Sequence, residues 1–179
     1  MKLFIGIGNP DNEFLETRHN IGKKIINDLA RDFSVELEVK NNLGAEIAII
    51  GSDEEKNILA NSLSFMNDSG WPVKAIAGFY KISLEDIWVI HDEFDIPLGE
   101  IRENFDSSSA GHNGIKSIIK ELGCQKFNRV RIGIKPEKET REPLEDFVLK
   151  KFRKEEEKKL EETVEKAKKI ISCKLEIKN

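Results

Sequence analysis

The chain has 179 residues, 39% of them hydrophobic, which predicts one globular domain, residues 1–179, with a sizeable core. No apolar run approaches the roughly 18 residues of a membrane span, and the N-terminal sequence lacks a signal-peptide pattern, so we expect a cytoplasmic protein. The net charge of -4 excludes a global attraction to polyanions, so a nucleic acid would have to meet a local basic cluster.

The first half of the chain alternates between strand and helix patterns. Residues 3–7 are almost continuously apolar, which is typical of a strand buried on both faces. Helical spacing follows in Ile21, Ile25, Ile26, Leu29 and Phe33. Residues 45–50 and the run NILAN from residue 57 predict further strands. The run MNDSGWP predicts the start of a helix, with Pro72 in its first turn.

The second half continues this alternation and predicts an α/β fold. Residues 87–90 form another apolar strand, and a helix ending at Gly123 contains Ile115, Ile118, Ile119 and Leu122. In RVRIGIK, apolar residues alternate with Arg129, Arg131 and Lys135, so one side of this strand is basic. A charged helix from about residue 153 to 172 should pack on the surface of the core, residues 1–152. We expect a central mixed, largely parallel sheet flanked by helices.

Polar clusters follow the two most apolar strands. Asn9 and His19 come after the first strand, and HDEFD, residues 91–95, follows the second. Because ligands bind beyond the carboxyl ends of such strands, we expect the two clusters to meet. Asp92 would then orient His19 as a general base with a free Nε2. No Ser or Cys lies in a nucleophile-elbow motif, which favours water as the nucleophile.

A metal site is the competing interpretation of these clusters. A ligand set could be formed by His19, His91, Asp92, Asp95 and His112, although spacings such as HExxH are absent. The two cysteines, Cys124 and Cys173, have neither metal-ligand nor redox spacing. We therefore predict no metal and no cofactor. In a simpler interpretation, Asp92 and Asp95 only make hydrogen bonds in the turn that follows.

Two further polar stretches precede predicted helices. DSSSAGHNG places Gly111, His112 and Asn113 near free backbone N–H groups, which can bind a phosphate or a carbonyl. Asn67 is most simply a helix cap, and its amide could also face a ligand. The Phe and Met before it fit either the core or an adaptable apolar wall.

Six motifs follow one another along the chain in a characteristic order: GIGNPDNEFLETRHNIG, SFMNDSG, VIHDEFDIPLGEIR, AGHNGIKSI, FNRVRIGIKP and FVLKKF. With these motifs the chain resembles, from residue 3 to about residue 152, the bacterial type of peptidyl-tRNA hydrolase. The resemblance implies hydrolysis of the ester between a peptide and the 3′ ribose of tRNA, with peptidyl-tRNA as the partner. Nothing in the sequence requires a dimer, so we expect a monomer.

The resemblance also implies roles for individual residues. His19 would activate water, and Asp92 would orient it. Asn9 would help to distinguish N-blocked peptidyl-tRNA from free aminoacyl-tRNA. The full set of implied substrate-binding residues is Asn9, Phe14, Phe65, Met66, Asn67, Gly111 and Asn113. The acceptor-stem phosphates would meet Arg129, Arg131 and Lys135.

The chain departs from the family pattern in three places. Phe14 stands where the family usually has an aromatic residue with a hydroxyl group. The stretch NFDSSSAGHNG contains Asp106 and serines where glycines are common in the family. Asn104 stands where many relatives have a lysine that clamps the 5′ phosphate. An RNA-binding relative without turnover is the second hypothesis from another class; the retention of His19 and Asp92 argues against it.

Overall fold

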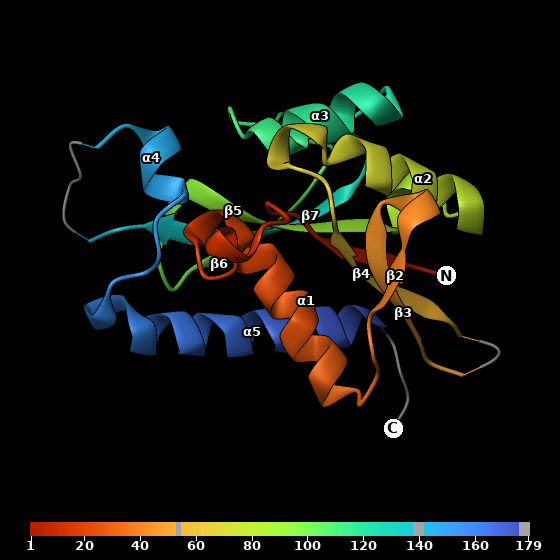
Figure 1. The fold of residues 1–179 in the computed structure, drawn as a ribbon, viewed down its shortest axis with the longest axis horizontal. Coiled ribbons are helices and arrows are strands. Elements are labelled where there is room, and N and C mark those ends of the chain that lie inside the picture. The colour runs from red at the N-terminus through yellow and green to blue at the C-terminus, as the bar shows by residue number, and fades with distance from the viewer. Residues whose placement is uncertain (53–54, 138–141, 176–179) are drawn as a thin grey trace.

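The computed structural model describes residues 1–52, 55–137 and 142–175. Within this part of the chain the strands form one seven-stranded sheet in the order β2-β3-β4-β1-β5-β7-β6 (Figure 1). The strands are β1 (Leu3–Gly6), β2 (Glu38–Lys40), β3 (Ala45–Ile50), β4 (Asn57–Ser62), β5 (Ile87–Pro97), β6 (Ile101–Phe105) and β7 (Asn128–Lys135). The central strands β4, β1, β5 and β7 are parallel, whereas β2, β3 and β6 add antiparallel edges. This confirms the predicted mixed, largely parallel sheet.

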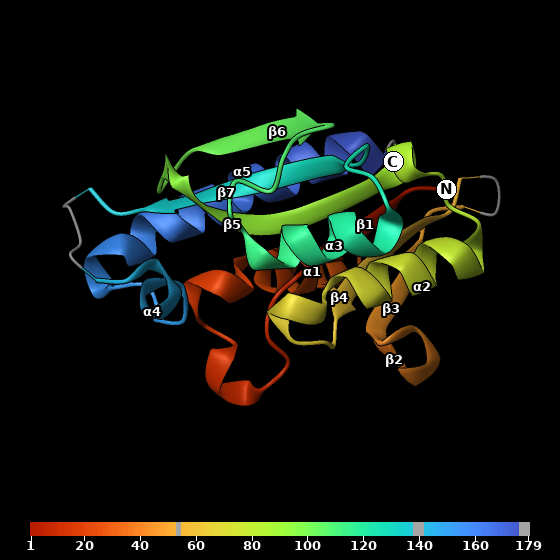
Figure 2. The same cartoon turned by 90° about the horizontal axis from the view of Figure 1, so that it is seen from above.

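Helices cover both faces of the sheet. They are α1 (Ile21–Asp32), α2 (Gly70–Tyr80), α3 (Asn113–Leu122), α4 (Leu144–Val148) and α5 (Glu157–Leu175). Helices α2 and α3 pack on one face, and α1 and α5 pack on the other (Figures 1 and 2). Because both faces are covered, the residues of β1 are all buried, as their continuous apolar pattern predicts.

The C-terminal helix α5 begins at Glu157, after a 3-10 turn (Lys154–Glu156), and therefore a few residues later than predicted. Its narrow apolar stripe packs on the sheet beside α1, where Val164, Ala167 and Ile171 are each at most 4% exposed. Among residues 1–52, 55–137 and 142–175, no helix combines the length and apolar character that crossing a bilayer requires.

Strand β5 is longer than its apolar residues predict. It continues through the polar residues 91–95 to Pro97, because β7 pairs with it as far as Glu93 before the register shifts. The prediction that these residues follow the strand was therefore wrong. His91 and Asp92 lie inside β5, and their side chains are held by a strand rather than by a turn.

Candidate active site

The connection from β1 to α1, residues 7–20, is called the β1–α1 segment and carries His19 in a 3-10 turn (Arg18–Asn20). Helix α1 starts directly against β5: a Cβ on Gly22 would lie 2.2 Å from the carbonyl oxygen of Ile90. The Asn20 side chain accepts a hydrogen bond from the Asn9 backbone N–H and donates one to the Asn9 carbonyl, each at 2.9 Å. Close packing and paired amides therefore fix both ends of the segment that holds His19.

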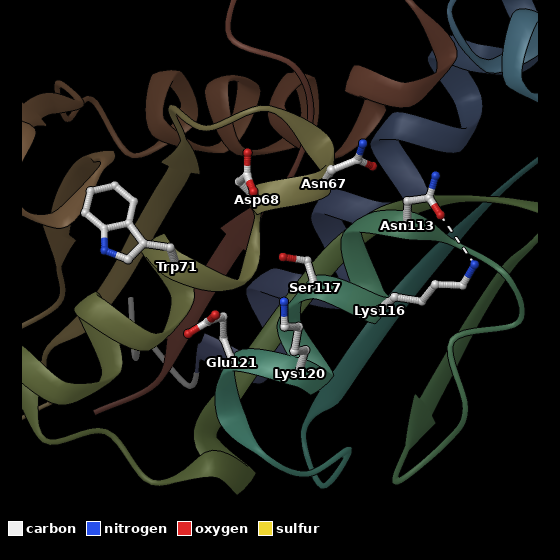
Figure 3. A pocket seen from close by; sticks show the side chains of 8 residues that line it. All are labelled: Asn67, Asp68, Trp71, Asn113, Lys116, Ser117, Lys120 and Glu121. Carbon is white, nitrogen blue, oxygen red and sulfur yellow. Dashed lines mark hydrogen bonds between the residues drawn. The ribbon is translucent and has the colours of Figure 1, made fainter.

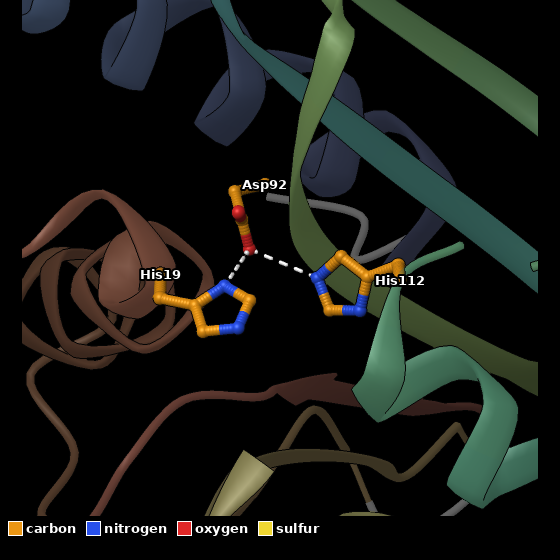
Figure 4. A group of neighbouring side chains, drawn as sticks. All are labelled: His19, Asp92 and His112. Carbon is orange, nitrogen blue, oxygen red and sulfur yellow. Dashed lines mark hydrogen bonds and ion pairs between the residues drawn. The ribbon is translucent and has the colours of Figure 1, made fainter. Parts of the chain in front are cut away.

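Asp92 is the point where the two predicted clusters meet. Its side chain is buried, and its Oδ1 lies 2.8 Å from Nδ1 of His19, which confirms the predicted pairing. The same oxygen lies 3.0 Å from Nε2 of His112 (Figure 4). One carboxylate oxygen thus binds two imidazoles that come from opposite helical layers.

The general-base hypothesis did not include His112, which the sequence analysis grouped with Asp92 only in the alternative metal-ligand set. His112 is the N-cap of α3, and its Nδ1 accepts a hydrogen bond of 3.4 Å from the backbone N–H of Ile115. Its ring lies 4.7 Å from the His91 ring and 5.0 Å from the His19 ring. The only sequence signal was a histidine at a helix start; a separation of 20 residues from Asp92 gives no periodic pattern.

The hydrogen bonds fix the charge and the tautomers of this cluster. Burial of Asp92 raises its pKa, but His19 and His112 outweigh burial and hold the pKa well below its usual range. The carboxylate can therefore only accept, so both imidazoles donate to it, and the tautomer of neutral His19 in this arrangement carries its proton on Nδ1 and leaves Nε2 as the acceptor. Burial, reinforced by the neighbouring His112, lowers the pKa of His91 well below its ordinary value. His91 is thus neutral, and its Nδ1 lies 2.7 Å from the Asp92 carbonyl.

His19 and Asp92 line a cavity of about 270 Å³ at the carboxyl end of the central strands. Gly111, His112 and Asn113 form one side of the cavity, and the α4 residues Leu144 and Val148 contribute apolar surface. A second groove of about 380 Å³ runs between α2 and α3 and also includes Asn113 (Figure 3). Asn113 therefore lines both the cavity and the groove.

The three predicted amide residues differ in their surroundings. Asn9 is buried, and its Oδ1 accepts a hydrogen bond of 2.9 Å from the Met66 backbone N–H, which leaves Nδ2 as the donor. Asn67 and Asn113 are exposed and line the same groove (Figure 3). Asn67 does not cap a helix, which corrects the simpler interpretation: Ser69 is the N-cap of α2, and neither this cap nor the preceding one is closed by a side chain.

The predicted apolar substrate residues do not form a single wall. Phe65 is 52% exposed, but Met66 is buried in the core beneath α2 and α3. Phe14 is half-buried in a 3-10 turn (Asn12–Phe14), where its carbonyl accepts a hydrogen bond from Thr17. Gly111 has φ +85° and lines the cavity beside His112.

The predicted basic side of β7 is only partly accessible. Arg131 binds Glu93 at 2.9 Å and Asn104 at 2.9 Å, and Lys135 is exposed at the end of the strand. Arg129, by contrast, is 2% exposed, which corrects the expectation that it faces phosphates. The chain between β6 and α3 passes over Arg129, and the Ser107 and Ser108 carbonyls accept hydrogen bonds from it. Asn104, in place of the clamp lysine, is thus a partner of Arg131.

Three members of the alternative metal-ligand set do gather. The ligand atoms of His19, Asp92 and His112 lie within 4.8 Å of one another, so these residues could hold a cation. Of the other two, His91 binds a backbone carbonyl and Asp95 is exposed. Because both imidazoles donate to the same carboxylate oxygen, each proton would have to leave before a metal could bind.

The family model described as peptidyl-tRNA hydrolase matches residues 3–179. The chain belongs to the peptidyl-tRNA hydrolase family. A peptidyl-tRNA hydrolase of Geobacillus kaustophilus is 40% identical over 168 residues, which are 93% of this chain and 89% of the relative. One of Pediococcus pentosaceus is 42% identical over 87% of this chain and 83% of its own length.

Solved structures of the family have the same fold. The crystal structure of peptidyl-tRNA hydrolase from Acinetobacter baumannii superposes with a TM-score of 0.88 at 28% identity, over 96% of this chain and 87% of that chain. The predicted resemblance is therefore confirmed. As a member of the peptidyl-tRNA hydrolase family, this chain is an enzyme of translation that acts on peptidyl-tRNA.

Proposed function

We propose that the chain hydrolyses the ester between the peptide and the 3′ ribose of tRNA by a water molecule that His19 activates. The observation that carries this proposal is the 2.8 Å contact between His19 Nδ1 and Asp92 Oδ1 at the wall of the cavity. His19 Nε2 is then free to accept a proton from water. The substrate is peptidyl-tRNA, and we expect the enzyme to act as a cytoplasmic monomer without a metal or cofactor.

The reaction then follows two proton transfers. His19 takes a proton as water attacks the ester carbonyl, and the Asp92 carboxylate stabilises the imidazolium that forms. When the tetrahedral intermediate collapses, the imidazolium returns its proton to the departing 3′ oxygen of the ribose. The products are a peptide with a free carboxyl group and a tRNA with a free hydroxyl.

Amide groups suit a substrate whose peptide sequence varies. Asn9 Nδ2 is a fixed donor because Met66 occupies Oδ1, and Asn67 and Asn113 offer exposed amides at the groove beyond. Amides bind the backbone groups that every peptide shares, without adding charge. We assign the peptide backbone and the tRNA 3′ end to these residues, with Phe65, Phe14 and Gly111 alongside.

The tRNA acceptor stem requires cationic groups near this end of the sheet. Arg131 and Lys135 supply them on β7, and Arg131 is already oriented by Glu93 and Asn104. Replacing Arg131 with Ala should weaken tRNA binding and reduce the slope of affinity against salt concentration by about one counterion. Exposed Arg31 on α1 is the matched control, since its loss should leave the slope unchanged. An unchanged slope in Arg131→Ala would place the tRNA elsewhere.

The deciding experiment follows the release of tRNA from N-acetylaminoacyl-tRNA and, separately, from unblocked aminoacyl-tRNA, both in the presence of EDTA. We expect cleavage of the blocked substrate only, and a decrease of at least about 100-fold in turnover for His19→Ala with little change in tRNA affinity. Sensitivity to EDTA would support the metal-dependent alternative. Binding of tRNA without cleavage would favour the RNA-binding alternative, and unchanged turnover in His19→Ala would refute the assignment of the base.

A further inference from the structure

We infer that Arg129 is a positioning residue for catalysis, which holds the chain between β6 and α3 so that His112 stays bound to Asp92. This chain, residues 106–112, is called the β6–α3 segment. The inference rests on the proposed function, because it assigns His112 to the same catalytic carboxylate. It replaces the phosphate contact that the sequence suggested for Arg129.

Two hydrogen bonds from Arg129 tie the β6–α3 segment to the sheet. One terminal nitrogen of the guanidinium donates to the Ser108 carbonyl at 2.6 Å, and the other donates to the Ser107 carbonyl. The guanidinium carbon also lies 4.8 Å from the centre of the buried Phe127 ring. Burial, together with the adjacent charge of Arg131, lowers the pKa of Arg129 to about 10, so the guanidinium still carries its charge. A planar fork bound to two successive carbonyls fixes both their position and their orientation.

The β6–α3 segment needs such an anchor because its backbone is strained. Asp106 has φ +48° and Ala110 has φ +46°, both in the left-handed region that disfavours residues with a Cβ. A tight turn then brings the His112 backbone N–H to 2.9 Å from the Ser109 carbonyl. Strained backbone of this kind persists only where its surroundings hold it. Arg129 binds Ser107 and Ser108, the two residues between Asp106 and this turn.

The position of His112 depends on the same segment. His112 closes the turn with its backbone N–H, and its Nε2 reaches Asp92 at 3.0 Å while its Nδ1 caps α3. If the two carbonyls were released, the turn could relax and His112 could leave Asp92. The Asp92 carboxylate would then keep only one of its two donors, His19, and the oxygen that orients His19 would itself be held less firmly.

Steady-state kinetics separate this role from a phosphate contact. We expect Arg129→Met to lower kcat on N-acetylaminoacyl-tRNA roughly tenfold, while KM and its salt dependence stay unchanged. Arg129→Lys, which can reach one carbonyl, should recover part of this loss. A higher KM with a smaller salt slope in Arg129→Met would overturn the inference in favour of a phosphate contact.

A double-mutant cycle with His112→Ala tests whether Arg129 acts through His112. In the His112→Ala background, Arg129→Met should change kcat less than about twofold, because the group it positions is already absent. Equal losses in both backgrounds would contradict the inference. Val164→Ala, a cavity in the α5 layer on the opposite face of the sheet, is the control for general destabilisation and should leave kcat unchanged. If Val164→Ala lowers kcat as much, loss of stability explains the effect instead.

A spectroscopic measurement judges the inference even if the proposed function fails. The chain has three histidines, and His112→Ala identifies the imidazole NMR signals of His112. Arg129→Met should shift these signals, and Val164→Ala should not. If the wild type shows no His19-dependent hydrolysis, the proposed function fails while this measurement still tests the contact. Unshifted His112 signals in folded Arg129→Met would overturn the positioning role.

Discussion

The β1–α1 and β6–α3 segments both deliver a histidine to the same oxygen of Asp92, but they differ in construction. The first is held by close backbone packing at Gly22 and by the paired amides of Asn9 and Asn20. The second contains two strained residues and is anchored by one guanidinium. A catalytic side chain can therefore be positioned by a well-packed backbone or by a strained one, provided that its contacts allow only one conformation. Only the first segment depends on a glycine for close packing, whereas both use a buried guanidinium, Arg18 in the first and Arg129 in the second.

Removing the negative charge of Asp92 should lower kcat more than any other change, because the histidines of both segments bind this carboxylate. Asp92→Asn should lower kcat roughly 1,000-fold, since a neutral amide neither fixes the His19 tautomer as well nor stabilises the imidazolium. The measurement is kcat on N-acetylaminoacyl-tRNA beside tRNA affinity, which should change little. Asp95→Asn, an exposed carboxylate of the same strand, is the control. A near-normal rate in Asp92→Asn would leave this carboxylate with a structural role only.

Adding a methyl group at Gly22 should break the first segment alone. The new Cβ would meet the Ile90 carbonyl oxygen at 2.2 Å, so α1 must move away from β5. We expect Gly22→Ala to lower the free energy of unfolding by about 2 kcal/mol and to lower kcat by displacing His19. Denaturant titration and kinetics measure the two effects. Gly78→Ala in α2 has open space around its Cβ and should stabilise the protein by up to about 1 kcal/mol. Equal behaviour of the two variants would contradict the role given to close packing.

A glycine substituted into the β6–α3 segment should have the smallest effect of the three changes. It should raise the free energy of unfolding, whereas Gly22→Ala should lower it. Ala110→Gly should raise the free energy of unfolding by about 1 kcal/mol, because glycine adopts φ +46° without steric cost. Its kcat should change less than about twofold while Arg129 remains. The control Ala75→Gly, inside α2, should instead lower the free energy by about 1 kcal/mol. A loss of stability in Ala110→Gly would show that the segment is not strained.

The central elements of the fold and the main pair of the site could be predicted from the sequence, and the edge strands could not. The central strands, the main helices and the meeting of His19 with Asp92 followed from apolar periodicity and from the rule that ligands bind at the carboxyl ends of strands. The edge strands β2 and β6 are short and largely exposed, so they carry no apolar pattern.

Buried charged residues were the main failure of prediction. Arg129 looks like a surface residue in the alternating pattern of β7, because pattern alone cannot show that carbonyls from residues 107–108 cover it. Arg18 is buried in the same way, although it is not among the predicted site residues: it is 2% exposed and donates to the carbonyls of Lys150 and Lys151, which are remote in sequence. Partners this distant become visible only when the tertiary structure is known.

Side chains alternate between the two faces of the sheet along β5, and this alternation restricts insertions and deletions within the strand. His91 lies beside the α3 layer, and the next residue, Asp92, reaches the start of α1. A deletion or insertion of one residue before this pair would turn each side chain to the opposite face of the sheet, so the carboxylate would no longer meet His19. The number of residues from the start of β5 to Asp92 is therefore fixed by the site, whereas the strand beyond Glu93 pairs with β7 in a shifted register.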